Sequence, residues 1–318
     1  EACNFLAKKL PLMSGSEYME YQNAISHSAY FSEAQIEEMA ASGGTDWQSL
    51  IYRPAWTHDH SINIKGGTDK VKVSTGLSFL DENGIIGGTS YMKLSGRNKV
   101  DYTINDYLSI SSSIIYTHTV HNTQSGITSH TLKATPTLAP YQEDGSYTSM
   151  RTAYSFSPTG LLNPLAMVNE RSFRFVSDRT MANVALNVKP IKQLVIRIAA
   201  NVNANNGRQD DYTTSKMQDA TSKAEVTPSR SMGIMSDNTI TYADNICDHS
   251  FSVMAGATYE QSTSSSFGRV SSNLSSDLAR VYGIQAAETH ETPTASYSKW
   301  TMLSFLGRAN YSYKDRYL

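Results

Sequence analysis

Apolar and polar residues alternate almost without interruption through residues 91–118, and no other feature constrains the fold of this chain as strongly. Successive side chains of a β-strand point to opposite faces, so a period of two predicts strands whose two faces meet different environments. One face carries Met92, Leu94, Val100, Tyr102 and Ile104, and the other carries Lys93, Ser95, Arg97, Lys99, Asp101 and Thr103.

The same alternation recurs along the chain, which predicts an all-β protein. The apolar sets are Val71, Val73, Leu77 and Phe79; Val184, Leu186 and Val188; Leu194, Ile196, Ile198 and Val202; Phe251, Val253, Ala255, Ala257 and Tyr259; and Leu303, Phe305, Ala309, Tyr311 and Tyr313. No compositional break separates two domains, and we expect one domain over residues 1–318.

Short and long connections between these segments alternate. The short ones contain the turn formers Gly, Asn, Asp and Pro, and they are 66–69, 104–106, 189–193, 244–248 and 314–316. The long ones are about 11–54, 118–169, 204–225 and 261–300, with a medium one from Asp81. Short turns at one end and long loops at the other predict an antiparallel up-and-down meander that stands across a boundary.

Composition excludes several classes of protein. A formal net charge of -2 gives no drive toward nucleic acid. Mean hydropathy is -0.39, and the apolar runs are far shorter than the roughly 20 residues of a membrane-spanning helix, whereas the strands of a transmembrane β-barrel look polar on average. The first ten residues lack the apolar core of a signal peptide, and the chain ends as a strand begins, so we expect a piece of a longer protein, truncated at both ends. Cys3 and Cys247 stand far apart, without metal-ligand spacing, and either pair or stay free.

The alternation by itself leaves open which face meets which solvent. A soluble β-sandwich with cross-strand tyrosines is one solution. The segment 89–104, however, is much longer than a common soluble strand of about 5 to 6 residues. We therefore expect the apolar face to meet lipid and the polar face to line a wet lumen. Tyrosines expected near strand ends, where an interfacial girdle would stand, are Tyr102, Tyr107, Tyr116, Tyr311, Tyr313 and Tyr317.

Two short helices are expected within the first long connection. Ser14 with Glu17 and Ser32 with Gln35 have the spacing of capping boxes, and Phe31 stands where a hydrophobic staple begins.

Several segments, in order, resemble one family, the SusC/RagA-type TonB-dependent outer-membrane transporters. "GGTDWQSLIYRPAWTHDHSINIKGGTDKVKVSTGLSFLDENGII" is similar to the family block that runs from TDWQ to GYxDxxGI, although Ser78 and Phe79 replace its Gly and Tyr. "LNPLAMVNE" resembles the Asn-Pro segment that re-enters the barrel after a long loop. "AKKLPLMSGSEYMEYQNA", "DHSFSVMAGATYEQ" and "SFLGRANYSYKDRYL" resemble further family segments.

The resemblance implies a partial transmembrane β-barrel in the cell outer membrane. The family barrel has about 22 strands around a plug. We expect about nine of them here, with a tenth beginning, and neither the plug nor the later strands. By resemblance the parent protein imports oligosaccharides or peptides, with a SusD-like surface lipoprotein as lid and TonB acting through the plug. A receptor for another cargo, such as an iron chelate, and a secreted β-rich adhesin or carbohydrate-binding module are the alternatives. No cofactor and no enzyme activity are expected.

Candidate site residues fall into two groups. On the polar face, Lys93, Arg97, Lys99, Asp101 and Arg197 either contact the plug or simply line water. In the long loops, where binding residues concentrate, Tyr141, Tyr147 and Tyr154 either stack on substrate or, as we favour, pack the loop's own small core.

Metal-binding and catalytic patterns are weak. His58 and His60 share one side of a strand, but zinc needs a third ligand, none is visible in the sequence, and a polar rim near the interface is the favoured interpretation. His118 with His121, at the start of a loop, rank no higher. Asp210 and Asp211, expected in a loop, form a possible hard-cation pair or, more simply, a solvated turn. No Ser/His/Asp spacing implies a nucleophile.

Overall fold

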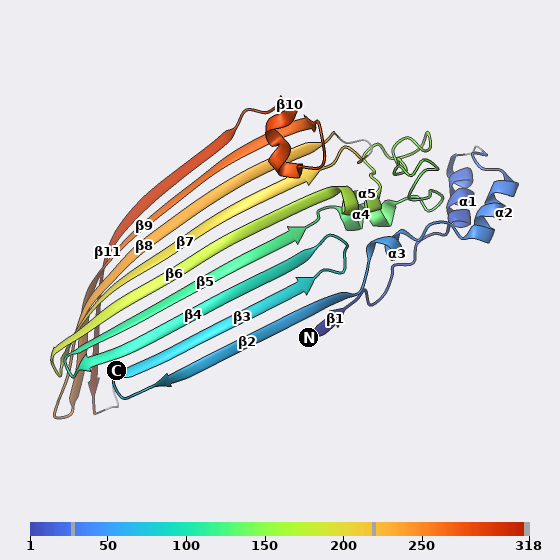
Figure 1. The fold of residues 1–318 in the computed structure, drawn as a ribbon. Helices are drawn as coiled ribbons and strands as arrows, with labels where there is room; N and C mark the ends of the chain where they lie inside the picture. The colour runs from blue at the N-terminus through green and yellow to red at the C-terminus, as the bar shows by residue number, and fades with distance from the viewer. Residues whose placement is uncertain (27–28, 218–220, 315–318) are drawn as a thin grey trace.

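A computed structural model describes residues 1–26, 29–217 and 221–314 of the chain. The described strands form one antiparallel sheet in which neighbours in the sequence are neighbours in space from β1 to β10, and β11 pairs with β9 (Figure 1). The strands are β1 (Ala2–Asn4), β2 (Ala55–Gly67), β3 (Val71–Asn83), β4 (Ser90–Asn105), β5 (Leu108–Thr123), β6 (Arg171–Ile191), β7 (Leu194–Thr213), β8 (Lys223–Ile246), β9 (His249–Leu274), β10 (Ala287–His290) and β11 (Thr294–Tyr313). The expected all-β meander is confirmed.

The two ends of the sheet differ as the sequence predicts. Residues 68–70, 106–107, 192–193 and 247–248 form tight hairpins, all at the end where the C-terminus is marked in Figure 1. The connections 84–89, 124–170 and 275–293 lie at the opposite end, together with residues 214–217 and the helices. We call these the turn end and the loop end.

Residue register places the apolar residues on one face of the sheet. Leu94 pairs with Phe79 on β3 and with His118 on β5, and the same face continues through Val184 to Phe305 on β11. Leu94, Val184 and Phe305 are 46%, 52% and 79% exposed, so this face has no protein core against it. A soluble sandwich would bury these side chains.

The polar face is the concave one. One groove of about 330 Å³ spans β2 to β5 and is lined by Ser61, Asn63, Ser78, Ser95 and Arg97, among others. A second groove, of about 390 Å³, spans β5 to β9 and β11. Most residues that line them have the register of the polar face, so the sheet curves around its hydrophilic side.

Aromatic rings gather on the apolar face close to the turn end. Tyr242 stacks on Phe251 with ring centroids 5.9 Å apart, and His249 contacts Tyr311 and Tyr313 at 5.9 and 4.9 Å. Such a row at the ends of strands is typical of the aromatic girdle at a membrane interface.

Three details of the sequence prediction were wrong. Tyr116 lies in the middle of β5, not near its end, and its hydroxyl donates to Asp178. The connections expected over 204–225 and 261–300 are shorter, because β7, β8, β9 and β11 run further toward the loop end. Those extensions have polar residues on both faces, as in 203–211 and 260–266, so the ladder continues where the apolar alternation stops. Tyr317 lies outside the described residues.

The helices lie at the loop end and include the two that were predicted (Figure 1). Both capping boxes are present: Ser14 N–H donates to Glu17, and Ser32 bonds reciprocally with Gln35. The helices are α1 (Gly15–Ser26), α2 (Glu33–Ser42), α3 (Trp47–Ile51), α4 (Ile127–Lys133), α5 (Pro164–Glu170) and the 3-10 helix η1 (Arg280–Ala286). Among the described residues, no helix has the length and apolar character needed to cross a membrane.

Candidate functional site

The residues predicted to face the lumen all lie on the polar face of the sheet, four of them on β4 and one on β7. Lys93, Arg97, Lys99 and Asp101 alternate along β4, where Lys99 Nζ lies 2.9 Å from Asp101 Oδ2. Arg197 is on the same face of β7, and its guanidinium donates to Asn187 Oδ1 at 3.3 Å. Because β5 and β6 separate β4 from β7, Arg197 does not join the β4 group.

A polar groove across β5 to β11 was missed by the sequence analysis. Asparagine amides form a ladder on its floor: Asn183 donates to Asn201, and Asn203 accepts from Arg179 at 3.0 Å. Trp300, which is 46% exposed, lines the same groove of about 390 Å³. An aromatic ring beside amide groups offers both stacking and hydrogen bonding.

Glu260 adds a carboxylate to this groove. Glu260 pairs with Met302 on β11, and Met302 is two residues from Trp300. Glu260 and Trp300 therefore share the concave face. The alternation of "NVALNV" and "NVNAN" places their asparagines on the face opposite Val184 and Val202, and this signal was available in the sequence.

Two of the three candidate loop tyrosines pack the loop. The Tyr147 ring is buried, and its hydroxyl donates to Glu170 Oε1 at 3.0 Å and accepts from Asn169 at 3.2 Å. Burial raises the pKa of Tyr147 to about 12. Tyr154 stacks on Phe156 with centroids 5.0 Å apart.

Tyr141 differs from these two residues because its ring is 45% exposed. The centroid of its ring lies 5.1 Å from that of the buried Tyr147 ring, so one side of the Tyr141 ring packs against protein. Of the three candidates, Tyr141 is the one whose ring is open to a ligand.

The Asn-Pro segment 162–170 is explained by local hydrogen bonds. Asn163 caps α5 through Leu165 and Ala166, and its amide donates to the carbonyls of Pro140 at 2.9 Å and Thr148 at 3.2 Å. The cap therefore ties the long 124–170 connection to the start of β6.

The Thr-Asp-Trp-Gln tetrad at 45–48 forms hydrogen bonds to two other segments at the loop end. Thr45 Oγ1 donates to Leu138 O at 2.8 Å, and the buried Trp47 Nε1 donates to Thr135 O at 3.0 Å. Gln48 exchanges hydrogen bonds with the backbone of Leu10 at 2.9 and 3.0 Å. The tetrad thus joins the N-terminal segment and the external loop to the start of β2.

Asp46, the second residue of the tetrad, caps α3 and forms an ion pair with Lys9 at 2.6 Å. Partial burial raises the pKa of Asp46, but hydrogen bonds from Lys9 and Ser49 outweigh this effect and lower the pKa to about 2. The carboxylate is therefore ionised under all physiological conditions.

A groove of about 750 Å³ opens beside the tetrad. Its walls come from residues 9–14, α1, the tetrad and the 131–136 segment, and apolar side chains dominate them. Leu10, Leu12, Met13 and Tyr21 line the groove and are 55%, 49%, 48% and 48% exposed.

Two weak metal candidates are explained by local pairing. Asp210 and Asp211 were expected in a loop, but both lie in β7. Arg208 Nε donates to Asp210 Oδ1 at 2.8 Å. His118 and His121 belong to β5, and His118 Nδ1 lies 2.8 Å from Asp178.

Cys3 and Cys247 are exposed and free. Cys3 is in β1 at the loop end, and Cys247 is in a hairpin at the turn end.

Comparison with known proteins agrees with this architecture. TonB-dependent receptor P26 of Formosa agariphila is 23% identical over 326 aligned residues, which cover 98% of this chain and 32% of the relative. TonB-dependent receptor SusC of Bacteroides thetaiotaomicron is 21% identical over the same share of each chain. The RagAB peptide transporter superposes over 98% of this chain and 40% of its own, with a TM-score of 0.80 and 18% identity. Over nearly its whole length, the chain is similar to SusC/RagA-type proteins.

The similarity to SusC/RagA-type proteins is seen in both sequence and structure, whereas no protein-family profile matches the chain. The superposition on RagAB confirms the predicted antiparallel barrel fold. The chain spans about a third of the length of these curated relatives, 32% in both cases. The ferric citrate transporter FecA superposes over 81% of the chain with a TM-score of 0.50, so the match to RagAB is much the better.

Proposed function

We propose that this chain forms part of the wall of an outer-membrane TonB-dependent importer of oligosaccharides or peptides. One observation carries the proposal: a continuous sheet has an exposed apolar face and a concave face lined by amides and hydroxyls. In a bilayer, such a sheet keeps its backbone paired, turns hydrocarbon toward lipid and encloses a wet passage.

The groove that contains Trp300 and Glu260 is the part of the passage best suited to a polar, uncharged cargo. Asparagine side chains donate and accept hydrogen bonds, as sugar hydroxyls and peptide groups require. The Trp300 ring offers an apolar surface for stacking. The charged residues of β4 suit contacts with a plug, and TonB would act through a plug outside residues 1–318.

A SusD-like lipoprotein is the proposed partner at the loop end. The α1–α2 pair projects beyond the strands in Figure 1, and α2 has no buried residue. Exposed apolar side chains of this size cluster where proteins bind partners. We place the contact on the 750 Å³ groove and on the neighbouring Ile25 and Tyr30, which are 53% and 46% exposed.

Growth tests address the transport proposal. A strain that lacks the full-length receptor is expected to lose growth on one oligosaccharide or peptide mixture as the limiting nutrient and to keep growth on an iron chelate under iron limitation. The opposite pattern would favour the iron-chelate alternative, and unchanged growth in every condition would contradict import.

A residue-level test separates the groove from the fold. Trp300→Ala in the full-length receptor is expected to lower uptake of labelled cargo severalfold while barrel assembly stays normal. The matched control is Trp56→Ala, which removes a 56% exposed tryptophan from the apolar face and is expected to leave uptake of the cargo unchanged.

The partner contact is tested by co-purification. Leu12→Glu puts a charge into the apolar groove and is expected to reduce recovery of the lipoprotein with the receptor. Leu278→Glu is the control, since Leu278 is 97% exposed in a different connection. Equal recovery from both variants would move the contact away from this groove.

A further inference from the structure

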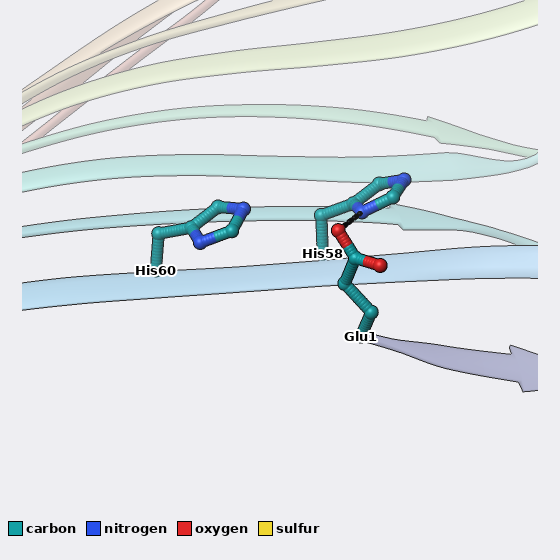
Figure 2. A group of neighbouring side chains, drawn as sticks. All are labelled: Glu1, His58 and His60. Carbon is teal, nitrogen blue, oxygen red and sulfur yellow. Dashed lines mark ion pairs between the residues drawn. The ribbon is translucent and has the colours of Figure 1, made fainter.

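Glu1, His58 and His60 gather on the apolar face of the sheet near the loop end (Figure 2). One ligand atom from each residue lies within 4.8 Å of the other two. His58 Nδ1 is 3.4 Å from Glu1 Oε1, and the two imidazole rings are nearly parallel, with centroids 6.5 Å apart. Figure 2 shows both histidines standing on the same side of β2 while the Glu1 carboxylate reaches toward His58.

Backbone pairing assembles the three side chains. Residues 58 and 60 are two apart in one strand, so their side chains share a face. β1 pairs with β2 through Ala2 and Thr57, which sets Glu1 beside His58 across the ladder. The third ligand that the sequence did not reveal therefore comes from 57 positions away.

The charges around the histidines suit a cation. Asp81 is the residue directly opposite His58 on β3, and the register places it on the same face. Glu1 and Asp81 thus flank His58 from the two neighbouring strands. Within the described part of the chain, no other group of three His, Cys, Asp or Glu side chains has this spacing.

Two imidazole nitrogens and one carboxylate form a donor set for a borderline divalent metal. Tetrahedral ligands about 2.0–2.2 Å from Zn²⁺ lie about 3.3 Å from one another. The Glu1 and His58 side chains are 65% and 38% exposed and His60 is exposed, so small rotations about their side-chain torsions close the remaining gap. Water would complete the coordination sphere, as in zinc sites with three protein ligands.

We propose that Glu1, His58 and His60 bind a divalent transition-metal ion of the Zn²⁺ class on the outer surface of the barrel. The site lies on the loop-end side of the exposed apolar residues Ile62 and Ile64, and it shares its face with Trp56. It opens away from the concave groove, so it is separate from the cargo path.

Titration of the full-length receptor with ZnCl₂ tests the site. The chelator-treated protein in detergent is expected to bind one Zn²⁺ that His58→Ala, His60→Ala and Glu1→Gln each weaken at least about 10-fold. His121→Ala is the matched control, because His121 is a strand histidine on the concave face, and it should retain wild-type binding. Co²⁺ in place of Zn²⁺ should give the visible absorption of a tetrahedral complex.

Other results would overturn the proposal. Unchanged Zn²⁺ affinity in the three variants, or an equal loss in His121→Ala, would place the metal elsewhere. Tighter binding of CaCl₂ than of ZnCl₂ would indicate a hard-cation site, which the two imidazoles do not fit. Heat-modifiable gel mobility verifies that each variant is folded, and His60→Gln replaces His60→Ala if the smaller side chain prevents assembly.

Discussion

The Trp47 indole N–H donates to the carbonyl oxygen of Thr135 at 3.0 Å, although 88 positions separate the two residues. Trp47 belongs to the helix that leads into β2, and Thr135 belongs to the connection between β5 and β6. Both residues are 3% exposed. The bond therefore fixes an external loop to the barrel wall from inside a small apolar cluster that includes Met150 and Leu161.

Trp47→Phe should loosen this loop without disturbing the barrel. Phenylalanine keeps most of the packing but removes the shorter of two hydrogen bonds to the Thr135 carbonyl, which also accepts from Leu138 N at 3.3 Å, so the loss should be about 0.5–1.5 kcal/mol. Limited proteolysis of outer-membrane vesicles should cut within residues 124–170 faster than in the wild type. Trp56→Phe is the control, since Trp56 is 56% exposed on the apolar face of β2. Equal cleavage of both variants would contradict a role of the Trp47–Thr135 bond in holding the loop.

The ion pair between Lys9 and Asp46 should make the N-terminal segment sensitive to acid. The pKa of Asp46 is about 2 in the fold against an ordinary value of 3.8, so its contribution is complete above pH 4 and is lost as the pH falls toward 2. Hydrogen exchange in residues 1–13 should therefore be slow at pH 7 and pH 5 and faster, after correction for intrinsic rates, near pH 2.5.

Asp46→Asn serves as the control for this prediction. The amide still caps α3 but carries no charge to pair with Lys9. Exchange in residues 1–13 should be faster at pH 7 and should show no further change with acid. If the wild type and the variant respond to pH alike, another group is responsible.

The strands and their faces could be predicted from the sequence where the solvents on the two faces differ. Leu94, Val184 and Phe305 share the exposed face because lipid requires an apolar residue at every second position of a strand. Beyond the bilayer both faces of a strand meet water or loops, so the ends of β7 and β9 carry no alternation and their sequence pattern predicts loops.

Contacts between segments that are distant in the chain could not be predicted from the sequence pattern. The approach of Glu1 to His58 depends on the register of β1 against β2. A strand of three residues is too short to show a periodicity that would reveal this register. The sequence favours a packing role for all three loop tyrosines, but only burial separates Tyr147 from the exposed Tyr141. The roles of the β4 charges toward a plug stay predictions.

Asp277 should hold two external connections together at the tops of β7 and β9. It accepts from the buried Tyr212 hydroxyl at 2.6 Å and from Ser215 N and Oγ at 3.1 and 2.7 Å. Asp277→Ala leaves the Tyr212 hydroxyl unpaired, at a cost of about 1–3 kcal/mol in local opening. Hydrogen exchange should accelerate in residues 213–217 and 275–287.

Two comparisons make the Asp277 prediction specific. Asp277→Asn keeps one acceptor oxygen and should have a smaller effect. Asp248→Ala removes an exposed carboxylate at the turn end, 3.5 Å from Lys314, and should leave exchange at the loop end unchanged. Acceleration of the same magnitude in all three variants would mean that the measurement reports general destabilisation.

Leu94 and Lys93 are neighbours in β4 and point to opposite faces, so they provide a direct test of which face meets lipid. Leu94→Arg places a charge in the bilayer and should destabilise the assembled barrel by about 2–4 kcal/mol if the residue is near the midplane. Lys93→Ser removes a charge from the wet side and should have a much smaller effect. Urea unfolding in lipid vesicles, together with heat-modifiable gel mobility, measures both. Since the two substitutions share a strand and a height in the membrane, an equal loss of stability would reverse the assignment of the faces, and with it the argument for a water-filled passage on the polar side.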